Sequence, residues 1–183
     1  FNADAGTVTV LGKNKAGNQA NVTFQGMQFA NTDGKMYVVT GDDLYATTST
    51  TTIRVGDGSK EGAQITADLD TVINDSAVSG GTSLVKSDAG TLIITKDQTY
   101  KGATTIKGGT LQLGDGGTEG QIANTAALHT QGILSVNRSD TVKLDQQIDG
   151  SGSLTQQGQG TTVLGGLNSY AGGTTITAGT PPR

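Results

Sequence analysis

The sequence predicts an all-β fold: a right-handed parallel β-helix, with three short strands in each coil and the coils stacked into an elongated solenoid. Three observations support this prediction: the composition, a two-residue spacing of apolar residues, and an internal repeat. Glycine supplies 29 of the 183 residues, 4% are aromatic and two are proline. Threonine favours the extended backbone and glycine supplies the dihedral angles of tight turns, so this composition is typical of many short strands.

Apolar residues recur in pairs that are separated by one residue. The pairs are Val8 and Val10, Val22 and Phe24, Ile53 and Val55, Leu92 and Ile94, Leu111 and Leu113, and Leu134 and Val136. Residues two apart in a strand point to the same side, so each pair predicts one buried face. This pattern argues against disorder, which the polar composition would otherwise allow. Collagen is excluded because glycine does not recur at every third position.

An internal repeat relates two segments at an offset of 70 residues, with Tyr100 aligned on Tyr170 and no gap over residues 84–110. The first-copy residues with identical counterparts are Leu84, Gly90, Thr91, Tyr100, Gly102, Thr104, Thr105, Ile106, Gly109 and Thr110. A weaker echo aligns residues 53–58 with 111–116, each a strand followed by a Gly-Asp-Gly turn. The strand spacing predicts coils of roughly 20 to 25 residues, stacked about 4.8 Å apart.

The predicted organisation has three parts. Residues 1–50 form less regular coils or an insertion, residues 51–180 form the repeat-bearing β-helix, and residues 181–183 form a terminal tail. Thr118 to Thr130 is the one segment where we expect a short helix or a distorted corner. The residues expected to point into the core, with their neighbours facing solvent, are Leu92, Ile94, Thr104, Ile106, Leu111, Leu113, Leu144, Ile148, Leu154, Leu164 and Ile176.

The repeated segment resembles a known family. Gly90-Thr91-Leu92-Ile93-Ile94, Tyr100-Lys101-Gly102 and Gly109-Thr110-Leu111-Gln112-Leu113-Gly114 follow one another as in the autotransporter-associated strand repeat, also called the passenger-associated transport repeat. Residues 144–154 resemble the same family's linking segment. The copies differ at residues 96–98 and 166–168, and Ala103 stands where the second copy has Gly173, which affects the shape of that turn.

The resemblance implies a passenger exported by type V secretion through the periplasm and outer membrane of a Gram-negative bacterium to the cell surface. It also implies a C-terminal translocator barrel elsewhere in the full-length chain, and folding outside the cell that helps draw the chain out. Members of the family include adhesins, biofilm factors and proteases, so the resemblance does not imply one activity.

We therefore expect a structural or adhesive virulence segment that contacts host surface or matrix molecules, or another passenger by self-association. The alternative is the non-catalytic stalk of an autotransporter enzyme, such as a serine protease, whose catalytic domain lies outside this sequence. The start at Phe1, without a signal peptide, suggests a fragment of a longer chain.

Several classes of protein are disfavoured. The chain has no cysteine, so it has neither disulfides nor a thiolate metal site. A net charge of −4 and a pI near 4.7 disfavour nucleic acid and anionic membranes as partners. The sequence lacks an apolar run long enough to span a bilayer, so we expect no direct membrane insertion by this segment.

Candidate chemistry is sparse, and we expect no enzyme, cofactor, metal or catalytic residue. His129 is the only histidine, and a triad with the nearby Ser135, Ser139 and Asp140 has no geometric support in the sequence, so a surface or corner histidine is preferred. A glycan-active enzyme would need converging carboxylates. The two groups considered, and interpreted as solvated turn carboxylates, are Asp68, Asp70 and Asp75, and Asp140, Asp145 and Asp149.

Two further segments are interpreted structurally. Residues 56–60 and 114–117 lack the spacing of a phosphate loop or a calcium loop, so they are predicted to be turns. The threonine-rich run from Thr47 to Thr52 could present a polar binding ladder, but a strand or loop of high β propensity is preferred.

Overall fold

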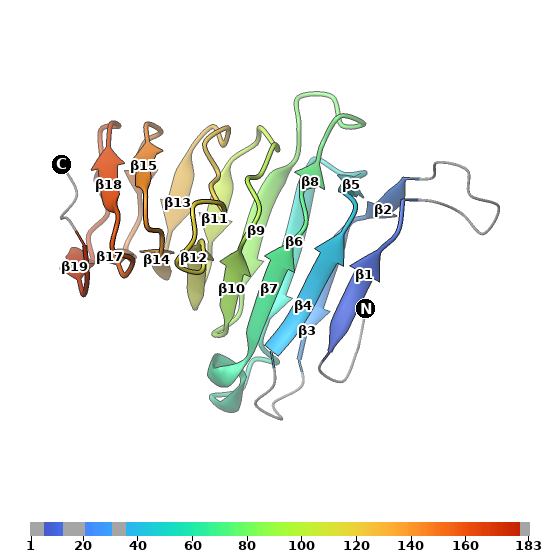
Figure 1. The fold of residues 1–183 in the computed structure, drawn as a ribbon, viewed down its shortest axis with the longest axis horizontal. Helices are drawn as coiled ribbons and strands as arrows, with labels where there is room; N and C mark the ends of the chain where they lie inside the picture. The colour runs from blue at the N-terminus through green and yellow to red at the C-terminus, as the bar shows by residue number, and fades with distance from the viewer. Residues whose placement is uncertain (1–5, 13–20, 31–35, 180–183) are drawn as a thin grey trace.

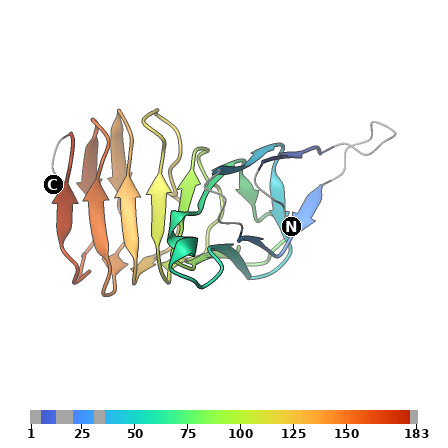
Figure 2. The same ribbon diagram turned by 90° about the horizontal axis from the view of Figure 1, so that it is seen from below.

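The structure is a computed structural model that describes residues 6–12, 21–30 and 36–179. Thr180 and the predicted tail at 181–183 lie outside the described residues. The chain is wound into coils that stack along the long axis of the molecule (Figure 1), and the stack is also apparent from below (Figure 2). All strand pairings are parallel, and the one helix in the described part is the short 3-10 helix η1 (Glu61–Gln64). The predicted parallel β-helix is confirmed.

Three faces surround the core. The long face is an eight-stranded sheet in the order β1 (Thr7–Val10), β4 (Met36–Gly41), β7 (Thr66–Asp70), β10 (Thr91–Ile94), β12 (Thr110–Leu113), β14 (Ile133–Val136), β17 (Ser153–Gln156) and β19 (Thr174–Ile176). The second face is a six-stranded sheet in the order β16 (Ile148–Asp149), β13 (Leu128–Thr130), β11 (Thr104–Ile106), β9 (Ser83–Ser87), β6 (Thr50–Val55) and β3 (Gly26–Phe29).

The third face is interrupted. Its first part is the sheet of β2 (Val22–Phe24), β5 (Leu44–Ala46) and β8 (Ile73–Asn74), and its second part is the pair β15 (Thr141–Leu144) and β18 (Thr161–Leu164). Between these parts, residues 95–103 and 114–127 form no strand. The segment from Thr118 to Thr130 contains an irregular corner and then β13, so only the distorted-corner half of its prediction is confirmed. The expectation that a short helix would occur only there is wrong, because η1 lies at Glu61–Gln64.

Coil length differs between the two ends of the stack. On the long face Thr7 pairs with Val38 and Val38 with Asp68, so paired positions there are about 30 residues apart. From β7 onward the spacing is shorter: Thr91 pairs with Thr110, which is 19 residues later. The coils near the N-terminus are accordingly broader in Figure 1. The predicted coil length holds from β7 onward, and the division of the chain at residue 50 stays a prediction.

The core is one continuous apolar column, and burial of this surface is the main stabilising contribution to the stack. Of the residues predicted to point inward, nine are buried: Leu92, Ile94, Thr104, Ile106, Leu111, Leu113, Leu144, Ile148 and Leu154. The prediction is wrong for Ile176, which is 44% exposed, and Leu164 is only half-buried. Both lie on β18 or β19, where no described coil stacks over them.

Polar side chains inside the column are hydrogen-bonded across coils. Thr51 and Thr82 lie 3.1 Å apart between their hydroxyl oxygens, and Thr104 lies 2.9 Å from Thr125. A buried hydroxyl without a partner would cost stability, so these pairs compensate for the loss of water. The threonine-rich run, predicted to be a strand or loop, is divided between the two: residues 47–49 form a loop and β6 begins at Thr50. Within β6, Thr50 is exposed and Thr51 is in the core.

Candidate functional site

The two repeat copies make the same internal contacts. The Tyr100 hydroxyl lies 2.7 Å from the Thr104 hydroxyl, and Tyr170 and Thr174 are separated by the same distance. In each copy the threonine comes four residues after the tyrosine. It is the first residue of β11 in the first copy and of β19 in the second. The repeat therefore carries its own fixed corner.

A side-chain amide takes the place of a missing strand in each copy. The Ile73 backbone N–H donates to Gln98 Oε1 at 2.8 Å, and the Ile148 N–H donates to Asn168 Oδ1 at 3.0 Å. Gln98 is buried, and its Nε2 also donates to the carbonyls of Thr71 and Lys96, each at 2.9 Å. In the sequence, Gln98 and Asn168 were noted only as members of segments that differ between the two copies. Their shared role was missed because Gln and Asn are common surface residues and the partner backbone lies about one coil away.

The copies nevertheless occupy different faces. In the first copy, β9 and β11 belong to the second face and β10 to the long face. In the second copy, β17 and β19 belong to the long face and β18 to the third face. Leu84 pairs with Thr104, which pairs with Leu128, which pairs with Ile148. Three complete coils thus separate Leu84 from Ile148, both on the second face. Leu154, which aligns with Leu84 in the repeat, lies six residues further along, on the long face. The 70-residue repeat is a whole number of turns plus one face.

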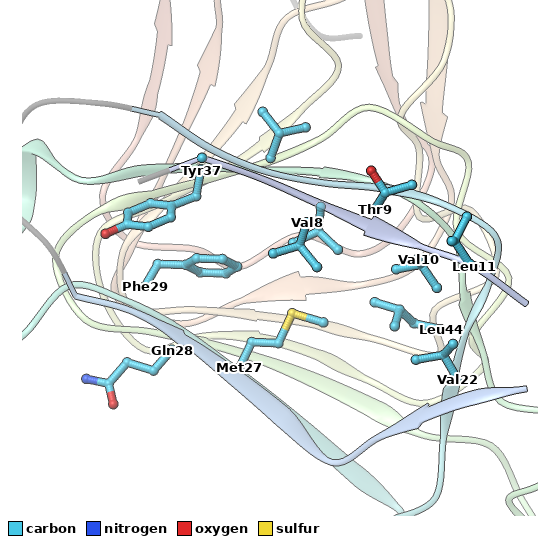
Figure 3. A pocket seen from close by; sticks show the side chains of 13 residues that line it. Val8, Thr9, Val10, Leu11, Val22, Met27, Gln28, Phe29, Tyr37 and Leu44 are labelled. Carbon is cyan, nitrogen blue, oxygen red and sulfur yellow. The ribbon is translucent and has the colours of Figure 1, made fainter. Parts of the chain in front are cut away.

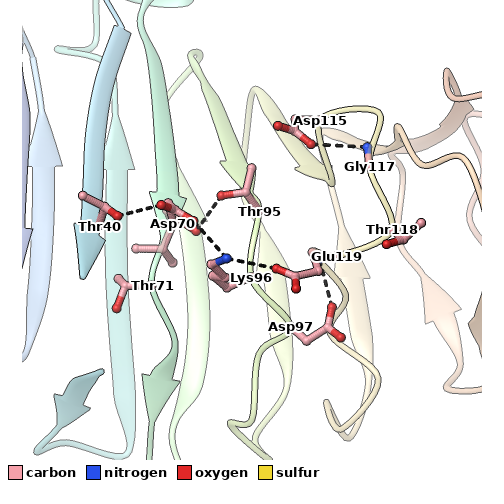
Figure 4. Close-up of polar contacts among 12 residues, drawn as sticks. Thr40, Asp70, Thr71, Thr95, Lys96, Asp97, Asp115, Gly117, Thr118 and Glu119 are labelled. Carbon is pink, nitrogen blue, oxygen red and sulfur yellow. Dashed lines mark hydrogen bonds and ion pairs between the residues drawn. The ribbon is translucent and has the colours of Figure 1, made fainter. Parts of the chain in front are cut away.

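A row of charged residues follows the edge where the long face turns toward the third face (Figure 4). Lys96 Nζ lies 3.0 Å from Glu119 Oε2 and 3.6 Å from Asp70 Oδ1, and the Thr40 hydroxyl donates to Asp70 at 2.6 Å. The hydrogen bond with Glu119 raises the pKa of Lys96. Each contact joins a different coil to its neighbour, although such exposed pairs contribute little to stability individually.

Asp68 and Asp70 are two residues apart and project from the same side of β7. Partial burial raises the pKa of Asp68, with a smaller effect of repulsion from Asp70, while the Thr95 hydroxyl donates to it at 2.7 Å and opposes the rise. Asp75 does not join them. It is buried and accepts the backbone N–H groups of Thr82 and Lys101, so it fixes a loop. The first carboxylate group therefore does not converge. Its interpretation as solvated turn carboxylates is wrong, because Asp68 and Asp70 are half-buried on a strand and Asp75 is buried.

The second carboxylate group, Asp140, Asp145 and Asp149, does not converge either. Arg138 forms a two-point contact with Asp140, from Nε at 2.8 Å and from Nη2 at 2.7 Å, and this bonding lowers the pKa of Asp140. Asp149 instead pairs with His129, with 2.7 Å between Oδ1 and Nδ1, and Asp145 is exposed. Three separate environments do not form the acid and base pair of a glycosidase.

Arg138 was missed by sequence reasoning. Its side chain is 3% exposed, Nη2 also donates to the Thr118 carbonyl, and Nη1 lies 3.6 Å from Asp97 Oδ1, beyond hydrogen-bonding distance. The guanidinium thereby holds the irregular corner of residues 114–120 against the next coil. The only available signal was Asp140 two residues later, which does not predict burial.

The serines considered as triad partners of His129 form hydrogen bonds with other groups. Ser135 is buried and donates to the side chain of Gln157, and Ser139 donates to the Gly117 carbonyl. Neither hydroxyl is hydrogen-bonded to the imidazole in the described contacts, whereas a nucleophile needs its base within hydrogen-bonding reach. His129 lies on the exposed side of β13, which agrees with its interpretation as a surface residue.

The two Gly-Asp-Gly segments lie in turns, as predicted. Gly58 and Gly116 have φ angles of 88° and 105°, in the region that favours glycine. Asp57 accepts hydrogen bonds from the backbone and hydroxyl of Ser59, which lower its pKa. Across residues 6–12, 21–30 and 36–179, no group of three His, Asp or Glu side chains is placed to hold a metal ion.

Two cavities are notable, and neither resembles a catalytic site. One cavity, of about 150 Å³, lies at the N-terminal end of the column and is lined mainly by apolar side chains that include Val8, Met27 and Phe29 (Figure 3). The other, of about 180 Å³, lies beside Asp75 and Lys101. In the described part of the chain, no helix is long and apolar enough to cross a membrane.

The fold and the paired copies define a class: a parallel β-helix that carries an internal repeat. Residues 84–113 and 154–180 match the family described as Passenger-associated-transport-repeat. The chain is 40% identical over 201 aligned residues to a protein named Adhesin BmaC autotransporter, from Brucella suis biovar 1 (strain 1330). The alignment covers 98% of this chain and 6% of that relative. No solved structure matches the chain.

These matches agree with the repeat positions and with the β-helix. The chain belongs to the passengers of autotransporters and carries two passenger-associated transport repeats.

Proposed function

We propose that this chain is a non-enzymatic adhesive segment of an autotransporter passenger, displayed at the bacterial cell surface. The observation that carries the proposal is the long face, an uninterrupted parallel sheet of eight strands whose outward side chains lie in register. The similarity to a protein named as an adhesin, over nearly the whole chain, supports it.

The outward side of the long face suits many weak contacts with an extended partner. One row contains Met36, Thr66, Thr91, Thr110, Ile133 and Ser153, each paired with the next across neighbouring strands. Met36 and Ile133 are exposed, and the four hydroxyl-bearing residues are half-buried. Rows about 4.8 Å apart offer hydroxyl and apolar groups at a regular interval, which fits a host protein surface or matrix molecule better than a small ligand.

We propose that the same stacking assists secretion. A single coil buries too little apolar surface to be stable, and each added coil pairs its backbone with the coil before it. Folding outside the cell would then favour outward movement of a chain delivered through a C-terminal translocator barrel. Fixed corners in each transport repeat, such as the Tyr100–Thr104 contact, would reduce the conformations that each new coil must search.

Binding of the purified chain to host cells and immobilised matrix proteins tests the adhesive function. We expect saturable binding that weakens in the double variant Thr91→Lys/Thr110→Lys on the long face. The matched control is Thr52→Lys/Thr105→Lys, which adds the same charges to half-buried outward positions of the second face.

The outcomes separate three hypotheses. Loss of binding in the first variant alone supports the long face as the adhesive surface. Equal effects of both variants would reject that face, although adhesion itself would remain. Absence of binding by the unaltered chain would reject adhesion and favour the alternative, a non-catalytic stalk of an autotransporter enzyme. Sedimentation of the same samples distinguishes binding by monomers from self-association.

A further inference from the structure

A lysine lies inside the apolar column. Lys86 is on β9, its side chain is 0% exposed, and it is paired in register with Ile53 of β6 and Ile106 of β11. The alternation of β9 places Leu84 and Lys86 on the same inward side. A lysine is almost never fully buried without specific partners, so its ammonium group needs an explanation.

The Lys86 ammonium is held by three backbone carbonyls. Nζ donates to the carbonyl oxygens of Asp88 at 2.7 Å, Gly108 at 2.9 Å and Ser87 at 3.2 Å. Three acceptors match the three N–H groups of an ammonium ion. Ser87 is the last residue of β9 and Asp88 follows it, whereas Gly108 follows β11 in the next coil, so the ammonium bridges two successive coils.

The backbone is shaped to aim these carbonyls inward. Asp88 has a φ of 67° and is the one non-glycine residue with positive φ in the described part of the chain. Gly109 has a φ of 63°, and a Cβ atom there would lie 2.6 Å from Lys86 Nζ. A left-handed conformation is unfavourable at a non-glycine residue, so its presence beside the ammonium indicates that the corner is built around the charge.

The charged groups around this corner do not neutralise Lys86 directly. On its own corner, the Asp88 carboxylate is engaged by Arg54 of the adjacent β6, with 2.9 Å between Oδ2 and Nε. Lys107, at the end of β11, donates its backbone N–H to the Lys86 carbonyl. Burial lowers the pKa of Lys86 to about 8, and the Asp88 charge opposes this shift.

We propose that the carbonyls of Ser87, Asp88 and Gly108 form a cage for a small monovalent cation, which the protein fills with the ammonium of Lys86 to join two successive coils. Its ligands are neutral carbonyl oxygens, which can accept the N–H groups of an ammonium ion and can also replace the hydration shell of an ion such as K⁺. This inference concerns the coil joint and is independent of the adhesive function.

Chemical rescue tests the cage directly. Lys86→Ala removes the ammonium and leaves space for a short alkylammonium ion. We expect ethylammonium chloride to raise the urea midpoint of this variant, and to raise those of the unaltered chain and of Lys86→Met less, because a ligand that binds only the folded state stabilises it. Tetramethylammonium chloride at equal concentration is the control, since it lacks N–H donors. An equal response to both salts, or an equal response of Lys86→Met, would overturn the proposal.

A pH series on the Met variant keeps the proposal testable if Lys86→Ala does not fold. The folded pKa of Lys86 lies below its unfolded value, so the unfolded chain binds more protons between about pH 8 and 10.5. The unfolding constant of the unaltered chain, relative to Lys86→Met, should therefore fall roughly tenfold between pH 8 and 9.5. A ratio that stays constant over this interval would show that Nζ is not held in a dehydrated cage.

Discussion

The first and second transport repeats share most of their sequence but not their surroundings. Tyr100 is 1% exposed and Ile106 is fully buried, whereas Tyr170 is half-buried and Ile176 is exposed. The first copy has coils on both sides, since β11 pairs with β9 and with β13. In the second copy β19 pairs only with β17 among the described strands. Identical residues thus differ in burial because neighbouring coils supply most of their contacts.

The contacts within each copy do not depend on those neighbours. The tyrosine–threonine hydroxyl pair has the same 2.7 Å separation in both copies, although one pair is buried and the other is exposed. The repeat therefore specifies a corner, and the stack specifies how much that corner contributes to stability. Substitutions at matched positions of the two copies should separate these contributions.

The largest difference is expected at the tyrosines. Tyr100→Ala should lower the free energy of unfolding by about 3–5 kcal/mol, because it leaves a large cavity in the column, whereas Tyr170→Ala should cost about 1 kcal/mol. Urea unfolding monitored by circular dichroism measures both. Equal losses would mean that the second copy is as fully packed as the first.

The isoleucines should show a smaller contrast. Ile106→Ala should destabilise the fold by about 2–4 kcal/mol through lost burial and an unfilled cavity, and Ile176→Ala by less than about 1 kcal/mol. Thermal melts of the two variants, recorded beside the unaltered chain, test this order. A larger loss for Ile176→Ala would contradict the observed exposure of β19.

The amides that replace a missing strand come next. Gln98→Leu should cost about 1–3 kcal/mol, because the Ile73 N–H and two carbonyls lose a buried partner, while Asn168→Leu should cost about 1 kcal/mol or less. Hydrogen exchange at the Ile73 and Ile148 amides reports each lost bond separately. Unchanged protection at both amides would exclude the proposed strand substitution.

The smallest effect concerns the hydroxyl pairs. Tyr100→Phe should cost about 1 kcal/mol because Thr104 loses one of its buried partners, although Thr125 remains. Tyr170→Phe should be close to neutral, since water can replace an exposed hydrogen bond. These paired variants preserve ring packing, so their difference in urea midpoint isolates the hydroxyl contribution; no difference would assign the hydroxyl pairs no role in stability.

Much of the fold could be predicted from the sequence because strand alternation is a local property. Leu92 and Ile94, or Leu111 and Leu113, are two residues apart and point inward, as their spacing predicts. The same alternation places Lys86 inward beside Leu84, although Lys86 was not among the residues predicted to point inward. Ile176 was predicted to be buried but is exposed, because no described coil covers it and its apolar character could not reveal that.

The candidate site was less predictable. Asp68 and Asp70 lie near each other on a strand and not in the predicted turn, and Asp75 and His129 contact partners that lie in other coils. The pairing of His129 with Asp149 spans 20 residues, and its register depends on the length of the connecting loops. Loop conformation leaves a weak trace in a single sequence, so cross-coil contacts such as Arg138 with Thr118 could not be anticipated.

Local sequence patterns determined where the strands and glycine turns lie, and the 70-residue repeat indicated stacked coils. These features depend on side-chain alternation and on backbone conformations available to a few residues. Only the tertiary structure decided that the second repeat is rotated by one face, that Ser87, Asp88 and Gly108 enclose an ammonium group, and which corner Arg138 holds. Those outcomes depend on accumulated loop lengths, because one added residue changes which side chains meet across every following coil.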